Sequence, residues 1–432
     1  MQSDHLDPRL RVLQHAEMKD KVVLVRVDHN VVKKGKIKDP YRIDVTFPTL
    51  YAIVEKGGRP ILMTHVGRPR DKKTGRIKCD EAESITPIVH YLEQKLPIKI
   101  HVPQFPIDPE AGIINLENTD VHPAIEKLKK RDIGMIYLPN TRWFQGEQSK
   151  GSEREKFTKW LAGLADFYIN DAFGSWQAHA STYDIASELP SYAGLLLQKE
   201  IANLSRLHQP ERPFVAVIAG AKYDTKIGPL MALYEKADYL ILGGILYNTF
   251  LSAKYGVEIS GVSEEDKALA LDLVRADSKK GKILELQYLV ESEDRETREK
   301  GKCRTIEIAD LEKGGKFGYI LDADPHSLEQ GKIENAVLSA KTIFVNAVMG
   351  LMPLFFEGSR VLYRLVGSNQ SAMKLFGGGD TLQELRNLCP DVYLAGLDSP
   401  DTYYFTGGGS VLAAVEKGSA YGLEPIKALM ED

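Results

Sequence analysis

Short apolar runs alternate with amphipathic segments along most of this chain, and the alternation predicts its secondary structure. In the first half, apolar runs predict strands at 21–27, 60–64, 98–102, 134–138 and 166–169, with amphipathic helices such as 84–96 and 153–165 between them. In the second half, they predict strands at 214–219, 238–242, 342–345, 373–376 and 392–395. Strands that alternate with helices indicate βαβ units and parallel sheets. We therefore expect an α/β protein with Rossmann-like parallel sheets flanked by helices.

The chain has 432 residues, whereas a single hydrophobic core rarely grows beyond roughly 250–300 residues. We therefore expect two similar-sized lobes that join near 189–207, where ELPSY precedes the helical pattern GLLLQKEIANLSRL. This helix would be a hinge, and the alternative is a helix inside one large domain. Residues 278–313 are highly charged and predict an irregular, solvated insertion. The expected divisions are an N-terminal lobe at 1–195, a C-terminal lobe at 196–408 and a tail at 409–432.

Composition and charge narrow the classes of function. The formal net charge is -4 and the sequence pI is about 6.3, so the chain lacks the basic excess of a general nucleic-acid binder. Cys79, Cys303 and Cys389 form no CxxC pair, which predicts free thiols in a reducing compartment. The N-terminus lacks the apolar core of a signal peptide, and the sequence has no apolar run of about 18 residues. We expect a cytoplasmic protein with no membrane or nucleic-acid partner.

The predicted strands of the first half run into polar residues rich in Arg, His and Asn. Ligands of open parallel sheets bind outside the carboxyl ends of the strands. Arginine forks and histidine bind phosphate and carboxylate groups with geometric specificity, so this half predicts a site for an anionic small molecule. Surface salt bridging is the alternative interpretation of Arg42. The candidate residues are Asp28, Asn30, Arg42, His65, Arg68, Arg142 and Asp171.

The predicted strands of the second half run into glycine-rich loops. Glycines let a backbone approach a ligand closely and aim N–H groups at anionic oxygens, and a following helix N-terminus adds partial positive charge. Neither a P-loop nor a G-x-G-x-x-G motif occurs. Each loop taken alone could be an ordinary turn, Lys222 a surface ion pair and Asp380 a helix cap. Taken with the basic half, the loops predict that one lobe holds an anionic acceptor and the other a nucleotide.

The motifs at these strand ends resemble those of the phosphoglycerate kinases, in the same order and over nearly the whole chain. The resemblance implies reversible phosphoryl transfer between 1,3-bisphosphoglycerate and ADP, giving 3-phosphoglycerate and ATP. It also implies Mg2+ as a cofactor, a monomeric state and a C-terminal tail that returns to the first lobe. The segments that carry it are VRVDHN, THVGRPR, NTRWF, INDAFGSWQAHAST, LPSYAGLLLQKE, ERPFVAVIAGAKYDTKI, FGGGDT, FTGGGSVL and GLEPIKAL.

The resemblance also implies roles for individual residues. Asp28 and Asn30 would hold the glycerate end of the substrate, and its carboxyl and phosphate groups would be held by Arg42, His65, Arg68 and Arg142. The groups that act on the migrating phosphoryl group would be Arg42, Lys222 and the backbone at Gly379 and Gly408. Asp380 would hold magnesium. The nucleotide would be bound by Gly220, Ala221, Lys226, Gly243, Gly244, Asn346, Gly350, Gly378, Gly379, Asp380 and Thr381.

The chain departs from the family pattern at several positions. The loop Ser175-Trp176-Gln177 is one residue shorter than the family's, so one substrate arginine is missing. Three hypotheses remain: a divergent working phosphoglycerate kinase, a paralogue that uses another carboxylate or acyl phosphate, and a binding or regulatory protein without turnover. Weakened selectivity for adenosine is also expected, because family residues that face the nucleoside are replaced by Ile245, Asp324, Val348 and Pro353; Ala219 replaces a glycine.

Overall fold

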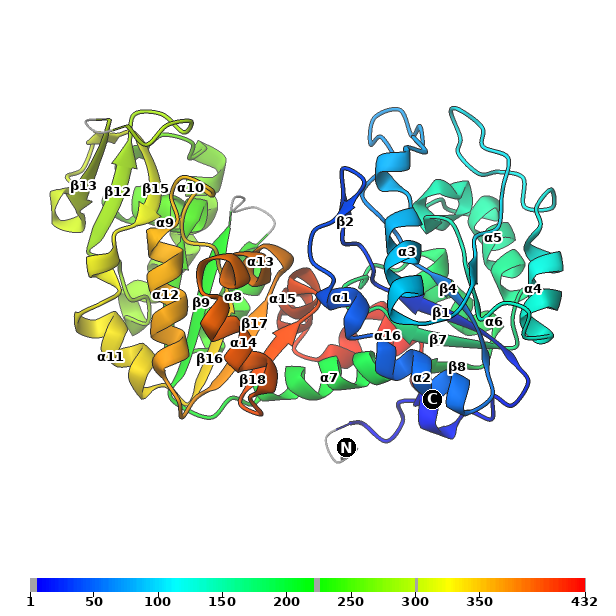
Figure 1. Cartoon of the computed structure of the whole chain (residues 1–432). Coiled ribbons are helices and arrows are strands. Elements are labelled where there is room, and N and C mark those ends of the chain that lie inside the picture. Colours follow the sequence, from blue (N-terminus) through cyan, green and yellow to red (C-terminus); the bar gives the residue numbers. More distant parts are fainter. Residues whose placement is uncertain (1–5, 221–225, 300–301, 432) are drawn as a thin grey trace. The chain divides into compact units, whose positions relative to one another are not determined.

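The computed structural model describes residues 6–220, 226–299 and 302–431. The chain forms two compact units (Figure 1): Met1–Ala202 together with Ala420–Asp432, and Asn203–Ser419. Helix α7 (Leu195–His208) runs across the division between them. Each unit contains a parallel sheet with flanking helices, so the expected fold class is confirmed.

The first unit is built on a six-stranded sheet in the order β5-β6-β4-β1-β7-β8, and every pairing in it is parallel. All six residues of the central strand β1 are buried, as expected for a parallel strand that is covered on both faces. The strands are β1 (Val22–Val27), β4 (Arg59–Met63), β5 (Ile100–His101), β6 (Met135–Tyr137), β7 (Phe167–Asp171) and β8 (Ser191–Ala193); β2 (Val32–Lys33) and β3 (Lys36–Ile37) form a separate hairpin. The helices are α1 (Tyr41–Asp44), α2 (Phe47–Glu55), α3 (Thr86–Lys95), α4 (Val121–Lys129), α5 (Ser152–Ala162) and α6 (Ile185–Glu188).

The C-terminal segment contacts the N-terminal segment within this first unit. Leu10 forms an antiparallel bridge with Met430, and the Arg11 Nη2 donates to the carbonyl oxygen of Ala428 at 2.7 Å. A short helix, α16 (Glu424–Lys427), lies in this segment. Residues 409–419, which the sequence grouped with the tail, lie instead in the second unit.

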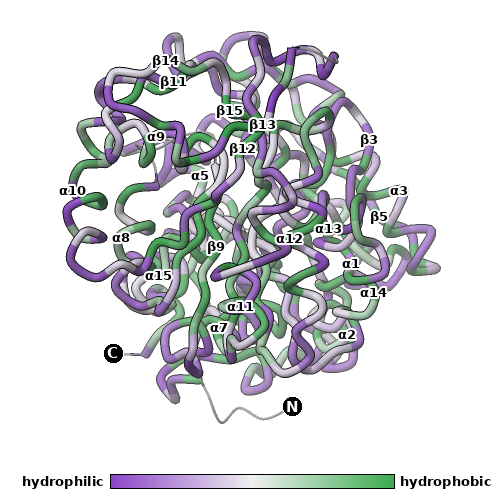
Figure 2. The backbone as a smooth tube through the Cα atoms, turned by 90° about the vertical axis from the view of Figure 1, so that its left-hand side faces the viewer, coloured by the Kyte–Doolittle hydropathy of each residue, from purple (hydrophilic) through white to green (hydrophobic). Residues whose placement is uncertain are grey.

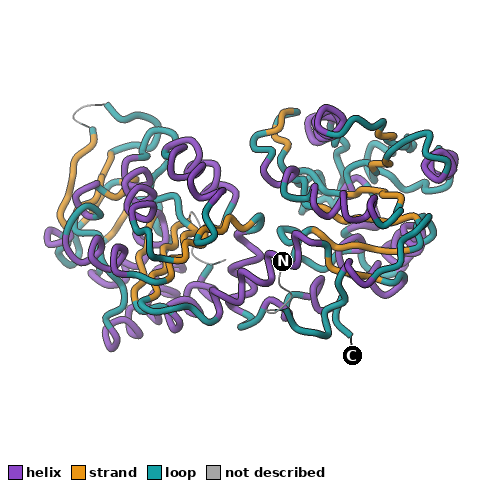
Figure 3. The backbone as a smooth tube through the Cα atoms, turned by 60° about the horizontal axis from the view of Figure 1, so that its bottom comes forward, coloured by secondary structure: helices purple, strands orange, loops and turns teal. Residues whose placement is uncertain are grey.

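The second unit is built on a five-stranded parallel sheet in the order β10-β9-β16-β17-β18. The strand β9 is one of its hydrophobic stretches (Figure 2), and helices lie on either side of the strands (Figure 3). The strands are β9 (Phe214–Gly220), β10 (Tyr239–Gly243), β16 (Thr342–Asn346), β17 (Met373–Gly377) and β18 (Thr402–Phe405). The helices are α8 (Ile227–Lys236), α9 (Gly244–Tyr255), α10 (Glu264–Lys280), α11 (Gly331–Ser339), α12 (Glu357–Ser368), α13 (Gly379–Leu388), α14 (Pro390–Asp398) and α15 (Gly408–Glu416).

The strand predicted at 392–395 is wrong, because these residues lie within α14. Cys389 precedes the helix, and Pro390 occupies its first turn, where the fixed φ of proline suits a helix start. The apolar residues that suggested a strand do not form a buried row, since Leu394 is 60% exposed. The last strand of the sheet is β18, a few residues further along the chain.

The interpretation of 278–313 as an irregular, solvated insertion is also wrong. This region contributes β12 (Tyr288–Ser292) and β13 (Cys303–Glu307), which form an antiparallel sheet with β15 (Tyr319–Ala323). The buried Glu291 accepts hydrogen bonds from Gly318 N and Arg304 Nε, each at 2.6 Å. Most residues of the edge strand β13 are exposed, which explains why its sequence reads as a surface loop. A second small pair, β11 (Glu258–Ile259) and β14 (Lys316–Phe317), is parallel.

Among the described residues, no helix is long and apolar enough to cross a membrane.

Asp171, at the end of β7, carries a buried carboxyl group whose ionisation should cost stability. Its Oδ1 accepts a hydrogen bond from Leu197 N at 3.1 Å, whereas Oδ2 has no partner among the described residues. Burial raises the pKa of Asp171 to about 7. A pKa that is higher in the folded state than in the unfolded state gives stability that is complete at low pH and is lost as pH rises through the folded pKa.

Asp171→Asn should therefore remove part of the fall in the free energy of unfolding between about pH 4 and pH 7. A shift of this size corresponds to at most roughly 4 kcal/mol of pH-dependent stability. Urea unfolding at pH 5 and pH 8 would measure it, with Asp132→Asn, at an exposed residue, as the control. An unchanged pH dependence in Asp171→Asn would contradict the assignment.

Candidate functional site

In the first unit, polar residues gather where β1, β4 and β6 end. Asn30 follows β1, and its Oδ1 accepts a hydrogen bond from Gly67 N at 3.0 Å, in the loop after β4. Arg142 follows β6, and its Nη1 donates to Gly67 O at 2.5 Å. The loop after β4 is thus held from both sides. Arg68, the next residue, is exposed. The pKa of Arg142 is lowered mainly by burial of its side chain, and the charge of Arg68 contributes to the lowering.

Asp28 and Arg42 form an ion pair at the edge of this cluster. The carboxylate of Asp28 is only 4% exposed, and Arg42 Nη1 lies 3.3 Å from its Oδ2. The other oxygen, Oδ1, is buried and has no hydrogen-bond partner among the described residues. A buried acceptor without a partner is costly. The Asp28 carboxylate is therefore suited to accept a hydrogen bond from a ligand hydroxyl.

His65 lies among cations rather than carboxylates. Its Nδ1 is 3.2 Å from Arg26 Nη2 and 3.4 Å from Ser175 Oγ. Burial lowers the pKa of His65 well below its ordinary value, and the nearby charges of Arg142, Arg26, Arg42 and His179 lower it further. His65 is therefore neutral, and a bound anion would balance the positive charge that surrounds it.

His29 belongs to the core although it stands between two candidate site residues. Its Nδ1 lies 3.0 Å from Tyr137 Oη and its Nε2 lies 3.1 Å from Thr46 Oγ1. Burial lowers the pKa of His29 to about 3. Both ring nitrogens have protein partners, so His29 supports the cluster from inside the unit.

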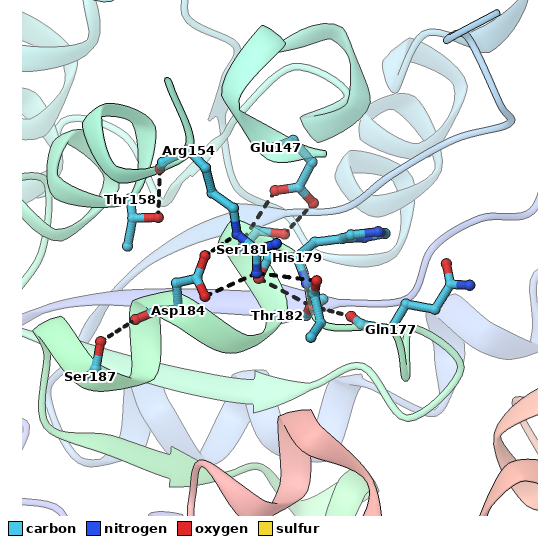
Figure 4. Close-up of polar contacts among 10 residues, drawn as sticks. Glu147, Arg154, Thr158, Gln177, His179, Ser181, Thr182, Asp184 and Ser187 are labelled. Atoms are coloured by element: carbon cyan, nitrogen blue, oxygen red, sulfur yellow. Dashed lines mark hydrogen bonds and ion pairs between the residues drawn. The ribbon is translucent and has the colours of Figure 1, made fainter. Parts of the chain in front are cut away.

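The shortened loop after β7 carries neutral side chains near the place of the missing arginine. Ser175 is near His65, and Gln177 is exposed. The segment that follows is held by Arg154, which pairs with Asp184 (Figure 4). Arg154 also donates from Nη2 to Ala178 O at 3.1 Å. Arg154 is therefore engaged in holding the backbone and does not replace the missing substrate arginine.

In the second unit, the loops after β17 and β18 meet at Asn346, the last residue of β16, and Lys226 also contacts it. Its Nδ2 donates to Gly377 O at 2.7 Å, and its Oδ1 accepts from Lys226 Nζ at 3.4 Å. Gly378 has a φ of 112°, a conformation that side chains disfavour. A Cβ added at Gly408 would lie 2.5 Å from Gly378 Cα and 2.7 Å from Asn346 Nδ2. The glycines thus allow several backbones to meet at one place.

Other predicted glycines also lie where a side chain would clash with neighbouring atoms. Gly220 and Gly244 form an isolated parallel bridge, and a Cβ at Gly244, where φ is 60°, would lie 3.1 Å from Gly220 O. A Cβ at Gly243 would lie 2.7 Å from the sulfur of Met349, and one at Gly350 would lie 2.1 Å from Phe355 O. These glycines are needed for the fold of the loops whether or not a ligand is bound.

Lys226 is the cation of this cluster within the described residues. Its Nζ donates to Ala219 O at 2.7 Å, and burial lowers its pKa while the charge of Asp380 opposes that change. The predicted residues Ala221 and Lys222 lie outside the described residues. Lys226 is thus held at the carboxyl end of β9, close enough to Asp380 for their charges to interact.

Two helices begin at this cluster, α13 at Gly379 and α15 at Gly408. The free N–H groups of a helix N-terminus bind phosphate oxygens. Asp380 and Thr381 lie in the first turn of α13, the former exposed and the latter buried. Among the described residues, no group of three or more His, Cys, Asp or Glu side chains is placed so that it could hold a metal ion. A single exposed carboxylate fits Mg2+ only if phosphates and water supply most of the ligands, as is usual for this ion.

Arg26 is a member of the basic cluster that the sequence did not indicate. It is the one charged residue of β1 and is only 1% exposed. Of the predicted residues, Asp28, Asn30, Arg42, His65 and Arg142 lie together with it. The signal that could have found Arg26 is a charge inside the otherwise apolar run VVLVRV, since such a charge is buried only when it has partners.

Comparisons with known proteins agree with this geometry. A family model described as phosphoglycerate kinase matches residues 13–417. A phosphoglycerate kinase of Dictyoglomus turgidum is 34% identical over 412 residues, which cover 94% of this chain and 95% of the relative. One of Rubrobacter xylanophilus is 33% identical over 413 residues, with the same two coverages. The solved structure of phosphoglycerate kinase from Coxiella burnetii matches with a TM-score of 0.72 and 27% identity, over 97% of this chain and 98% of that one.

Proposed function

This chain belongs to the phosphoglycerate kinase family, and from that membership we propose how its two polar clusters divide the reaction between them. The reaction is reversible phosphoryl transfer between 1,3-bisphosphoglycerate and ADP, which gives 3-phosphoglycerate and ATP. The chain is a phosphotransferase whose acceptor is a carboxyl group. The observation that supports the division of roles is the contrast between a cationic cluster in the first unit and a glycine-rich cluster with helix N-termini in the second.

In the first unit, the basic cluster holds the phosphoglycerate. The unpartnered Oδ1 of Asp28 accepts a hydrogen bond from the substrate's hydroxyl, and Asn30 borders the same site. The negative carboxyl and phosphate groups of the substrate fit the cationic surroundings of His65. Arginine binds such groups in a bidentate fashion. These roles fall to Arg42, Arg68 and Arg142.

In the second unit, the cluster around Asn346 holds the nucleotide phosphates. Lys226 and the helix N-termini at Gly379 and Gly408 direct N–H groups toward them, with Thr381 in the first turn of α13. Asp380 would hold the magnesium ion that accompanies the nucleotide and that, when bound, neutralises phosphate charge. The backbones of Gly220, Ala221, Gly243, Gly244, Gly350 and Gly378 complete this site.

The chemistry needs positioning and charge neutralisation rather than a general base. The attacking oxygen belongs to a carboxylate, which is ionised near neutral pH because its intrinsic pKa is only about 4. Catalysis therefore depends on in-line alignment and on stabilising the charge that spreads over the migrating phosphoryl group. We assign this task to Arg42, Lys222 and the amides at Gly379 and Gly408.

The two other hypotheses, a paralogue with a different acceptor and a protein without turnover, are not favoured, because the family match runs along nearly the whole chain. A coupled phosphoryl-transfer assay tests the proposal directly. We expect turnover with 3-phosphoglycerate and ATP, and much weaker turnover with other carboxylates. A larger kcat/KM for another acceptor would support the paralogue hypothesis, and no turnover with any acceptor would contradict the proposed enzymatic activity.

We also propose that the protein is a cytoplasmic monomer.

The nucleoside is expected to be selected less strictly than the phosphates. Asp324 stands where the family has a glycine. Its carboxylate accepts from His326 N at 3.1 Å in its own loop and from Thr305 Oγ1 at 2.9 Å on β13, so both of its oxygens already have protein partners. Loss of one specific polar contact changes kcat/KM by about tenfold or less. We therefore expect kcat/KM for ADP and GDP to differ by less than about tenfold. Steady-state assays with a panel of nucleoside diphosphates would measure this, and a strong preference for adenine would contradict it.

A further inference from the structure

A buried chain of hydrogen bonds joins Glu147 to His65. Glu147 Oε2 accepts from Ser181 N at 3.0 Å and its Oε1 accepts from Ser181 Oγ at 2.6 Å, as Figure 4 shows. Ser181 Oγ in turn accepts from Arg26 Nε at 2.9 Å. Arg26 Nη2 then reaches His65 Nδ1 at 3.2 Å. Glu147 and Arg26 are each 1% exposed and Ser181 is fully buried, so water does not compete with these bonds.

The direction of each bond in this chain is fixed by chemistry. A carboxylate can only accept, so the hydroxyl proton of Ser181 points to Glu147, and the lone pairs of that oxygen face Arg26. A guanidinium can only donate. Arg26 uses all three of its nitrogens, because Nη1 also donates to Val27 O at 2.5 Å. The buried guanidinium therefore has one orientation, and Glu147 supplies the negative charge that helps a buried cation to persist.

This direction determines the tautomer of His65. Because Arg26 Nη2 donates, His65 Nδ1 must be the acceptor, and the proton of the neutral ring must be on Nε2. The charged side chains that act on this ring are Arg26, Arg42, Arg142 and His179, all cations or potential cations. They oppose a second proton on the ring. The neutral Nε2–H can donate a hydrogen bond to an anion without adding a further charge to the cluster.

We propose that Glu147 and Ser181 are positioning residues for the reaction: they orient Arg26, which fixes His65 as the Nε2–H tautomer that donates to the phosphoglycerate. The proposal rests on the substrate role given to His65 under Proposed function. It assigns a task to two residues, on η4 (Gln145–Glu147) and η5 (Ala180–Asp184), that are buried behind the basic cluster. The short loop after β7 contributes to the same arrangement, because the Ser175 hydroxyl lies 3.4 Å from His65 Nδ1.

Nitrogen NMR of the wild-type protein labelled with 15N-histidine tests the tautomer without any assay of activity. A spectrum of His65→Gln identifies the resonances of His65. We expect a protonated Nε2 and an unprotonated Nδ1 at pH 7, with both unchanged on lowering the pH to about 5.5. A proton on Nδ1, or a doubly protonated ring at pH 7, overturns the proposal. Because this readout is independent of turnover, a failure of the proposed function would be seen separately in the coupled assay.

Ser181→Ala removes the bridging hydroxyl and keeps the backbone contact to Glu147. Loss of a hydrogen bond to a buried charged group should raise KM for 3-phosphoglycerate about tenfold, with KM for ATP unchanged and a mixture of His65 tautomers in the spectrum. Ser187→Ala is the matched control, because Ser187 is exposed in the next helix and its hydroxyl donates only locally, to Asp184 O at 2.7 Å. Unchanged kinetics and an unchanged spectrum in a folded Ser181→Ala overturn the positioning role. If Ser181→Ala does not fold, Glu147→Gln is measured in the same way, and the wild-type spectrum decides the tautomer in every case.

Discussion

Gly408→Ala is expected to lower kcat/KM for the nucleotide about 100-fold, since displacements near 1 Å at a reacting site can cost that much. The added Cβ would lie 2.5 Å from Gly378 Cα, 2.7 Å from Gly378 N and 2.7 Å from Asn346 Nδ2. Two of these three atoms belong to the backbone of the neighbouring glycine-rich loop, so no side-chain rotation can relieve the contact. The loop at Gly378 or the start of α15 must shift, and both are assigned to the phosphates.

Gly409→Ala provides the matched control for this prediction. Gly409 is exposed in the same first turn of α15, and alanine is favoured over glycine within a helix by about 1 kcal/mol. We expect Gly409→Ala to leave kcat/KM for the nucleotide within about threefold of the wild type. Steady-state kinetics at saturating 3-phosphoglycerate, with thermal unfolding to show that both variants fold, would measure the difference. Equal effects of the two substitutions would mean that the close approach at Gly408 is not important for the nucleotide site.

The parallel sheets could be predicted from the sequence because their strands are continuous apolar runs. All residues of β1 and β16 are buried, and a strand covered on both faces needs no alternating pattern. The same reasoning failed at 392–395, where an apolar run lies in a helix that starts at Pro390. It also failed at β13, an edge strand whose exposed residues are polar or charged. Apolar runs locate strands whose residues are buried, including the edge strand β10, and they do not locate an exposed edge strand such as β13 or distinguish short helices.

The candidate site was predictable in its residue types and only partly in its contacts. Strand ends that carry Asp28, His65 and Asn346 stand out in the sequence, because ligands of parallel sheets bind at those ends. Arg26 was missed because its partners are remote: Ser181 lies 155 positions away and His65 lies 39 positions away. Only the pairing of β1 with its neighbours brings these groups together, and such pairing follows from tertiary packing rather than local pattern.

Lys226→Ala is expected to weaken nucleotide binding without slowing turnover, and it is the variant with which Lys222→Ala should be compared. Lys226 Nζ already has two protein acceptors, Ala219 O and Asn346 Oδ1, so its charge is held in place before any reaction begins. A group that contacts phosphates equally in the ground state and in the transition state contributes to binding alone. We expect Lys226→Ala to raise the nucleotide Kd and KM together and to change kcat by less than about threefold. Isothermal titration of the nucleotide beside steady-state kinetics separates the two quantities.

Lys222→Ala should behave in the opposite way, with kcat lowered about 100- to 1,000-fold and the nucleotide Kd changed little. Lys222 follows Gly220-Ala221 in sequence, outside the described residues, within the motif that resembles the family's phosphate loop. An ammonium that meets the phosphoryl group during transfer strengthens its interaction as charge spreads over the oxygens, and such a contribution appears in kcat rather than in ground-state affinity. Lys222→Arg retains the positive charge with a different shape, so partial recovery of kcat is expected if the charge is what matters. Equal and small losses in kcat and in affinity for Lys222→Ala would leave this lysine without a catalytic role and would move the task of neutralisation to Arg42 and the amides at Gly379 and Gly408.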